Sequence, residues 1–265
     1  MIDIHTHVLP GIDDGSKNVE MTMQMLDEAY TAGFTDIITT SHYIENEYDI
    51  PKKTRQEIIN ALQEQLNEEG ININLYNGAE AFITNNLASL VDEGKIPTLA
   101  NSHYVLFEIP MTSKVLYLNQ VLEDLITSGY RPIIAHPERY SIVQENPNIA
   151  IEWVKSGALL QSNYASMVDR YGHKAKKTLI KLLNANAIHF LGSDTHRPKN
   201  NYKQMDEILE ELGFCRIHKS YLINLKYVDS MMRYQVCLSN GMELSISRKK
   251  YKDAEEKWIC YKGEI

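Results

Sequence analysis

The sequence predicts an α/β fold: a βα barrel of about seven units, followed by a short, mainly β C-terminal appendage. Two observations predict it. Through residues 1–212, short apolar runs alternate with longer amphipathic ones, the pattern of strands and helices on a parallel sheet. So many consecutive units favour a closed barrel over an open sheet. Residues 213–265 differ, with short alternating stretches rich in Tyr, Lys and Ser.

Strands are predicted where a short apolar run stands between turn residues. They cover residues 2–5, 35–39, 71–76, 104–108, 132–135, 158–161 and 187–191.

Helices are predicted where apolar side chains recur at helical spacing. In the first of them Val19, Met23 and Leu26 lie on one face, and Gly33 is suited to end the helix. The predicted helices cover residues 18–32, 53–69, 85–93, 115–128, 149–155, 174–184 and 202–212.

The composition is that of a globular protein. The 265 residues are 43% hydrophobic and 23% charged, with a formal net charge of −8. The chain contains no run of about 18 apolar residues, so no membrane-spanning helix is predicted. Its first residues lack the basic and apolar regions of a secretory signal. Three cysteines, an odd number, exclude a disulfide framework. We therefore expect a cytoplasmic protein.

Charge divides the chain near Gly213. Residues 213–265 hold ten Lys and Arg against six Asp and Glu, a net of +4, which leaves −12 for residues 1–212. We therefore predict two parts, 1–212 and 213–265. No Pro-, Gly- or Ser-rich linker separates them, which is unusual for independent domains.

Histidines and carboxylates end nearly every predicted strand of the first part. Because parallel strands end at one edge of their sheet, we expect these side chains to converge. Imidazole and carboxylate groups suit manganese, iron or zinc, and this many ligands suffice for two or three ions. The candidates are His5, His7, Asp14, His42, Glu80, Glu108, His136, Asp194 and His196.

Any single histidine of this set could instead be a packed or solvated side chain. The joint pattern argues for metal binding, since strands normally end in Gly, Asn or Asp. Packed or solvated roles are expected for the four remaining histidines, His103, His173, His189 and His218.

Six motifs in this order carry a resemblance to a known family. They are MIDIHTHVLPGIDDG at 1–15, SHY at 41–43, GAE at 78–80, FE at 107–108, IAHPER at 134–139 and GSDTH at 192–196. Residues 1–212 thereby resemble the polymerase-and-histidinol-phosphatase (PHP) superfamily. More narrowly, they resemble its bacterial tyrosine-protein phosphatases of the capsule and exopolysaccharide type.

The resemblance implies a distorted seven-stranded, TIM-like βα barrel with a three-metal site. The metal is usually manganese, and iron, zinc, magnesium or cobalt would also fit. Carried over motif by motif, one ion would be held by His5, His7, Glu80 and Asp194, a second by Glu80, Glu108 and His136, and a third by Asp14, His42 and His196.

The same resemblance assigns phosphate binding to Arg139, which we group with Asp194 and His196 as catalytic. A guanidinium offers a planar fork suited to phosphate. The alternative is that Arg139 only pairs with Glu138 or Asp194. We expect Asp13 and Glu138 to support the ligands rather than to bind metal.

The activity implied is hydrolysis of phosphotyrosine in proteins, with a bacterial tyrosine kinase of polysaccharide export as the partner. Clustered divalent ions suit this chemistry because they activate water and clamp phosphoryl oxygens. Tyr43 and Tyr140 are candidates for an aromatic pocket, or equally for packing. A small-molecule phosphoesterase, such as a histidinol-phosphate phosphatase, is the alternative.

A cysteine-dependent phosphatase is excluded, because that chemistry needs Cys and Arg six residues apart. The residue six after Cys215 is Tyr221, and the one six after Cys237 is Glu243. The net charge of −12 on residues 1–212 also disfavours nonspecific nucleic-acid binding by that part.

The tail resembles the second half of a LytTR-type DNA-binding domain, through FCRIHKSYLIN at 214–224 and a hairpin signal at Asn240-Gly241. This resemblance implies that Lys219 and Arg248 face DNA, so a DNA-binding regulator is a further alternative. The tail could be a true fusion, a remnant of gene joining, or a basic surface hairpin packed on the barrel. We favour the remnant, then the hairpin.

Overall fold

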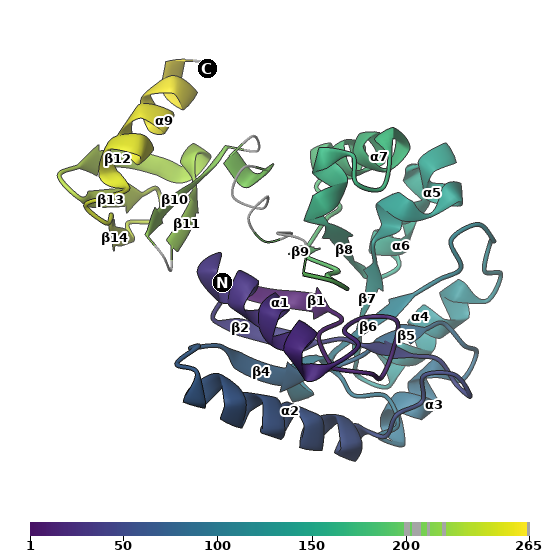
Figure 1. Ribbon diagram of the computed structural model, residues 1–265. Coiled ribbons are helices and arrows are strands. Elements are labelled where there is room, and N and C mark those ends of the chain that lie inside the picture. The colour runs from purple at the N-terminus through teal and green to yellow at the C-terminus, as the bar shows by residue number, and fades with distance from the viewer. Residues whose placement is uncertain (199–201, 203–207, 211–212, 219–220, 264–265) are drawn as a thin grey trace.

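Two parallel sheets form the frame of the N-terminal part in this computed structural model, which describes residues 1–198, 202, 208–210, 213–218 and 221–263 (Figure 1). The first sheet has the strand order β1-β2-β4, with β1 at Ile2–Thr6, β2 at Asp36–Thr39 and β4 at Asn74–Asn77. The second has the order β3-β5-β6-β7-β8-β9, formed by His42–Tyr43, Glu80–Phe82, Tyr104–Glu108, Arg131–Ala135, Leu159–Asn163 and Phe190–Gly192.

Short backbone contacts link the last strand to the first. Thr6 and Thr195 form a parallel bridge, and the His7 amide donates to the Thr195 carbonyl at 3.0 Å. The Asp194 amide donates to the His5 carbonyl at 2.8 Å. These contacts bring the polar residues after β9 against those at the end of β1.

Helices follow most of the strands, and each amphipathic helix packs its apolar face into the core. The helices are α1 (Val19–Thr31), α2 (Lys52–Glu68), α3 (Leu87–Asp92), α4 (Leu118–Thr127), α5 (Ser141–Glu145), α6 (Asn148–Lys155) and α7 (His173–Asn184). Single 3₁₀ turns, η1 to η3, cover Leu99–Asn101, Pro137–Arg139 and Tyr164–Val168.

Helix α1 illustrates how local sequence sets its ends. The Asn18 side chain accepts from the Met21 amide at 2.8 Å, which caps the first turn. Gly33 follows the last turn with a φ of 87°, a conformation that glycine adopts without steric cost.

Apolar side chains from β1, β2, β6, β7, β8 and β9 pack together between the strands. The buried members are Ile38, Leu99, Leu106, Ile133 and Ala135. Two larger cores lie between strands and helices, one centred on Phe107 and Leu122 and the other on Leu26 and Ile37.

The prediction of a mixed α/β fold with parallel strands is confirmed. The predicted strand over 71–76 is observed at Asn74–Asn77, and that over 187–191 at Phe190–Gly192. The sequence did not indicate α5 or the two short strands β3 and β5, because two or three residues are too few to show a period. The predicted helix over 202–212 falls largely outside the described residues. Within this range, residues 208–210 are described and are helical.

The described tail consists of antiparallel strands, as predicted for a mainly β appendage, and of one α-helix, α9. A hairpin pairs β10 (Phe214–His218) with β11 (Tyr221–Asn224). After the turn η4 (Leu225–Tyr227), a three-stranded sheet follows, and the chain ends its described part in α9. These elements are β12 (Val228–Met232), β13 (Gln235–Leu238), β14 (Glu243–Ser245) and α9 (Tyr251–Gly263).

Asn240 and Gly241 form the predicted turn between β13 and β14. Gly241 has a φ of 79°, and the Asn240 side chain accepts from the Met242 amide at 3.0 Å. The tail has a core of its own, built from Cys215, Ile217, Ile223, Leu225, Val228, Met231, Val236, Ile246 and Ala254.

The tail packs beside the N-terminal end of β1 (Figure 1). Phe214 and Leu222 contact the core that contains Leu26 and Ile37. Lys257 on α9 donates to a Glu210 carboxylate oxygen at 2.5 Å. In the described part of the chain, no helix is both long and apolar enough to cross a membrane.

Candidate metal centre

The two histidines of the first motif share one face at the end of β1. His5 lies within the strand and His7 two residues later, and side chains two apart in an extended chain point the same way. Both side chains are fully buried. They therefore point into the molecule at the edge where the parallel strands end.

Two carboxylates from distant strands meet these rings. Glu80 begins β5, and Asp194 follows β9. The His5 Nε2 atom lies 3.1 Å from Glu80 Oε2 and 3.6 Å from Asp194 Oδ1. The His7 Nε2 atom lies 3.3 and 3.4 Å from the same two oxygens. The ligand atoms of His5, His7 and Glu80 lie close enough to share one ion, and Asp194 groups instead with His5 and His136.

The ligands predicted for a second ion lie next to this group. The His136 Nε2 atom is 2.9 Å from Glu80 Oε1 and 3.8 Å from Glu108 Oε2. His42 Nδ1 lies 3.3 Å from an oxygen of Glu80 and 3.3 Å from one of Glu108. Glu80 therefore stands between the two groups, as a bridging carboxylate would.

The third predicted group opens toward solvent. His196 Nε2 lies 3.3 Å, and His42 Nε2 3.6 Å, from Asp14 Oδ1. The His196 ring stacks on His7 with ring centres 3.9 Å apart. Asp14 is 58% exposed, which makes it the outermost of these side chains.

All nine predicted ligands are thus brought together. We call them the ligand cluster. Ligand atoms close enough to share one ion occur in overlapping groups, and these differ from the three sets inferred by motif. His7 joins Asp14, His42 and His196. His42 takes the place predicted for His136 beside Glu80 and Glu108, and His136 groups with His5 and Asp194. His103, His173, His189 and His218 belong to none of the groups found among the described residues.

The donor set fits divalent cations. Within the described residues, the buried His42 Nδ1 atom has no hydrogen-bond partner although two carboxylates lie 3.3 Å away. Burial disfavours a charged His5 ring, but Glu80 and Asp194 outweigh it and raise the pKa of His5 to about 9. Burial, followed by the neighbouring Glu80, raises the pKa of the Glu108 carboxyl to about 8. A bound divalent cation would satisfy these closely packed imidazole and carboxylate groups.

Two ligands lie at unusual backbone positions. His136 has a φ of 34° and Asp194 a φ of 51°, in the left-handed region that side chains rarely adopt. Such strain is commonest at functional sites, where the surrounding structure maintains it. Here it turns each side chain into the cluster at the end of its strand.

Gly15 permits the first loop to fold back over His7. A Cβ atom at Gly15 would lie 2.3 Å from the His7 carbonyl oxygen. The same loop carries Asp13, whose carboxylate lies 2.8 Å from His7 Nδ1 and accepts from the His42 amide at 2.9 Å. Asp13 therefore orients a ligand, as the sequence predicted.

Sequence reasoning missed three residues that hold the ligands. Gln161 Oε1 lies 2.7 Å from His5 Nδ1. Arg197 donates to the carbonyls of Asp14 and His196 at 2.7 and 2.8 Å. Both adjoin signals that were available: Gln161 lies in the polar end of β8, and Arg197 follows GSDTH directly.

Arg55 is the third missed residue, and its sequence context gave no signal. It belongs to the amphipathic helix α2, where an arginine normally faces water, yet it is fully buried. It donates to the backbone carbonyls of Ser41 and His42 at 3.0 and 2.6 Å. Burial lowers the pKa of Arg55 to about 10. These bonds fix the loop that carries His42.

Arg139 reaches the cluster from the turn after β7. Its Nη1 donates to Asp194 Oδ2 at 2.8 Å, and its guanidinium lies 4.5 Å from the centre of the Tyr171 ring. The side chain is 26% exposed. Glu138 points elsewhere and accepts from the Asn163 amide and the Ser166 hydroxyl. The alternative pairing of Arg139 is therefore observed with Asp194.

The two tyrosines considered for an aromatic pocket are packing residues. Tyr43 and Tyr140 are buried, and the Tyr140 hydroxyl accepts from the Ile109 amide. Three tyrosine rings adjoin the cluster: Tyr140 lies edge-on to His136 with ring centres 5.5 Å apart, Tyr48 stacks on His42 with centres 6.2 Å apart, and Tyr171 lies against Arg139.

The structure does not test the prediction that Lys219 and Arg248 face DNA. Arg248 is exposed between β14 and α9, and Lys219 lies outside the described residues.

A sequence model of the family described as capsular polysaccharide synthesis, CpsB/CapC, matches residues 1–232. The match passes the boundary predicted at 212 and includes β10 to β12, so it gives no support to a separate LytTR-type module. The chain is 32% identical to the CapC protein of Staphylococcus aureus over 231 residues, which is 86% of this chain and 91% of that protein.

Two curated tyrosine-protein phosphatases are also similar. YwqE of Bacillus subtilis is 32% identical over 79% of this chain and 82% of its own length. CpsB of Streptococcus pneumoniae is 28% identical over 84% of this chain and 96% of its own length.

Two solved structures are also similar to this chain. A crystal structure from work on YwqE and CpsB, described there as metal-dependent tyrosine phosphatases, superposes with a TM-score of 0.76 at 31% identity. The match covers 80% of this chain and 87% of that one. A histidinol phosphate phosphatase from Lactococcus lactis, at 13% identity and a TM-score of 0.51 over 80% of this chain and 95% of its own, shares the fold. This chain belongs to the CpsB/CapC family of capsular polysaccharide synthesis.

Proposed function

We propose that this protein is a metal-dependent protein-tyrosine phosphatase, and that its substrate is a bacterial tyrosine kinase that controls capsule or exopolysaccharide export. The observation that carries the proposal is that the nine residues of the ligand cluster converge at the edge where the parallel strands end, with Arg139 beside them. We call this edge the rim. The names of the relatives YwqE and CpsB support the reaction class.

We further propose that the two sheets close into one distorted barrel around this rim. The bridge between Thr6 and Thr195 and the apolar cluster shared by six strands support closure. We take residues 1–212 as the phosphatase part, with a three-ion site, manganese as its metal, and the cytoplasm as its place of action.

The cluster's own residues prepare the site for a phosphate ester. Asp13 and Gln161 fix the rings of His7 and His5, so that their Nε2 atoms face Glu80, where an ion would be held. Glu80 offers one oxygen to each of two neighbouring positions. Bound ions would neutralise the phosphoryl charge and lower the pKa of a water held between them.

Arg139 is placed to bind the phosphoryl group. Its guanidinium reaches the cluster from one side, and Tyr171 lies against it. A planar fork binds two phosphoryl oxygens at once. The exposed Asp14 and the half-buried His196 lie at the open side of the cluster, where a tyrosine side chain on a protein can enter.

Small-molecule phosphate ester hydrolysis is the second candidate. The fold shared with histidinol phosphate phosphatase supports it. Phosphotyrosine is favoured because the relatives that match most of this chain carry that name.

The test measures phosphate release from a phosphotyrosine peptide and from histidinol phosphate. The full chain is stripped with a chelator, and manganese is then added back. We expect release from the peptide only after manganese is added, and little from histidinol phosphate. The opposite preference would establish the second candidate, and release without metal would contradict both.

A further inference from the structure

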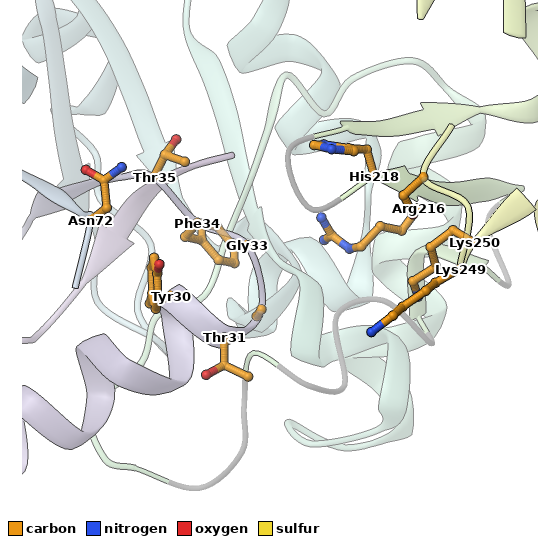
Figure 2. A pocket seen from close by; sticks show the side chains of 12 residues that line it. Tyr30, Thr31, Gly33, Phe34, Thr35, Asn72, Arg216, His218, Lys249 and Lys250 are labelled. Carbon is orange, nitrogen blue, oxygen red and sulfur yellow. The ribbon is translucent and has the colours of Figure 1, made fainter. Parts of the chain in front are cut away.

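A cavity of about 710 Å³ lies between the N-terminal part and the tail, and no residue of the ligand cluster lines it (Figure 2). One wall is the end of α1 with the start of β2, including Tyr30, Thr31, Phe34 and Thr35. The other wall comes from the tail.

The tail wall is cationic. Arg216 and His218 of β10 and Lys249 and Lys250 after β14 line the cavity, and in Figure 2 Arg216 and His218 point toward the end of α1. Among the described residues that line the cavity, none is acidic. Arg216 is only 6% exposed, so a guanidinium is held in a largely desolvated position beside this space.

Helix α1 does not offset this charge. Its C-terminal end presents carbonyl groups, which together act as roughly half a negative charge. Lys249 and Lys250, both exposed and both lining the cavity, carry two full positive charges against it. The nearby Asp36 carboxylate accepts hydrogen bonds from Thr35, Asn74 and Tyr76 on its own side of the sheet.

We propose that this cavity binds a small phosphate-bearing ligand with a flat ring, that is, a nucleotide. Cations around a concave, partly buried space favour multiply charged phosphate groups. The Tyr30 ring, 42% exposed at the mouth, offers a surface on which a base can stack. The volume lies in the range of small-ligand sites. The site is separate from the phosphatase chemistry and ties the tail to the rest of the chain.

Calorimetric titration of the full chain with ADP tests this, before and after chelation. We expect saturable 1:1 binding of similar affinity in both states. Replacing Lys249 and Lys250 together with Gln should weaken binding by about tenfold or more, since each removes a charged contact. The matched control removes two exposed lysines of α7, Lys174→Gln with Lys177→Gln, and should leave the affinity unchanged.

Two further titrations separate the parts of the ligand and the competing site. Tyr30→Ala should weaken ADP binding but not pyrophosphate binding, because only ADP carries a ring. Arg139→Ala should have no effect. Absence of saturable ADP binding, or equal affinity in the Lys249/Lys250 variant, would overturn the proposal. Loss on chelation or with Arg139→Ala would assign the binding to the metal centre, and tighter binding of a short DNA duplex would assign these lysines to nucleic acid.

Discussion

The ligand cluster and the tail core differ in what they bury. The rim holds His5, His7 and Glu80 at 1% exposure or less. The described tail buries apolar side chains, with Arg216 as its one charged exception. Buried ionisable groups cost free energy unless they are paired. We therefore expect bound ions to stabilise the rim, whereas the core of the tail is apolar and is stabilised mainly by packing. Function and stability should thus be separable by mutation.

The largest expected effect is on catalysis by the rim. His7→Ala removes a ligand shared by two groups of the cluster. We expect phosphatase activity to fall on the order of 10³-fold, since metal ions contribute several kcal/mol to such reactions. Bound manganese is measured alongside by mass spectrometry. His173→Ala, on the exposed face of α7, is the control and should retain full activity.

Arg139 tests whether the rim also recognises phosphate. We expect Arg139→Ala to lower kcat/KM by about 10²- to 10³-fold, because its contact with the phosphoryl group is lost. Metal content should stay unchanged, because Asn163 still donates to Asp194 Oδ2 at 2.7 Å. Arg139→Lys should recover little, since an ammonium lacks the planar fork. Normal kinetics in both variants would leave Arg139 as a partner of Asp194 only.

Asp13 tests the support behind a ligand. Asp13→Ala leaves His7 without its 2.8 Å partner. Manganese affinity should fall by about 10- to 100-fold, the usual effect of losing such a contact. Fluorescence or calorimetric titration of metal-free protein measures this. An unchanged affinity would mean that backbone geometry alone orients His7.

The tail core is tested by Ile217→Ala. Truncating a buried isoleucine costs about 2–5 kcal/mol, so hydrogen exchange in β10 and β11 should accelerate. Phosphatase activity should stay near that of the original chain. Ile259→Ala, at a side chain that is 61% exposed, is the matched control, expected within about 0.5 kcal/mol. Equal loss of activity would show that rim and tail are one cooperative unit.

Cysteine reactivity gives the smallest and finest test. Burial raises the pKa of the Cys215 thiol to about 11, so at pH 8 almost no thiolate is present in the folded tail. Cys260 is exposed. A disulfide reagent at pH 8 should label Cys260 rapidly and Cys215 only after unfolding. Comparable rates at both would mean that the tail core opens readily.

Much of the rim was predictable because most of its residues stand next to predicted strands in the sequence. Each ligand adjoins the end of a short apolar run, and parallel strands must bring those ends together. The antiparallel tail was predictable for a similar reason: Asn240-Gly241 fixes a turn and the flanking alternation fixes the faces. Glu80 was located correctly even though it begins a separate strand, β5, rather than ending β4.

What the sequence by itself determined is therefore the type of fold, the set of histidines and carboxylates that meet at the rim, and the change of composition near residue 213. Only the tertiary structure decided how the ligands group, that Tyr43 and Tyr140 are core, and that Arg55 is buried to fix the loop of His42. Tertiary structure alone also placed the tail's cations opposite α1. The physical reason is range: strand ends and turns depend on immediate neighbours in the chain, whereas burial and pairing depend on other elements, from 13 positions away for Arg55 and His42 to 156 for His5 and Gln161.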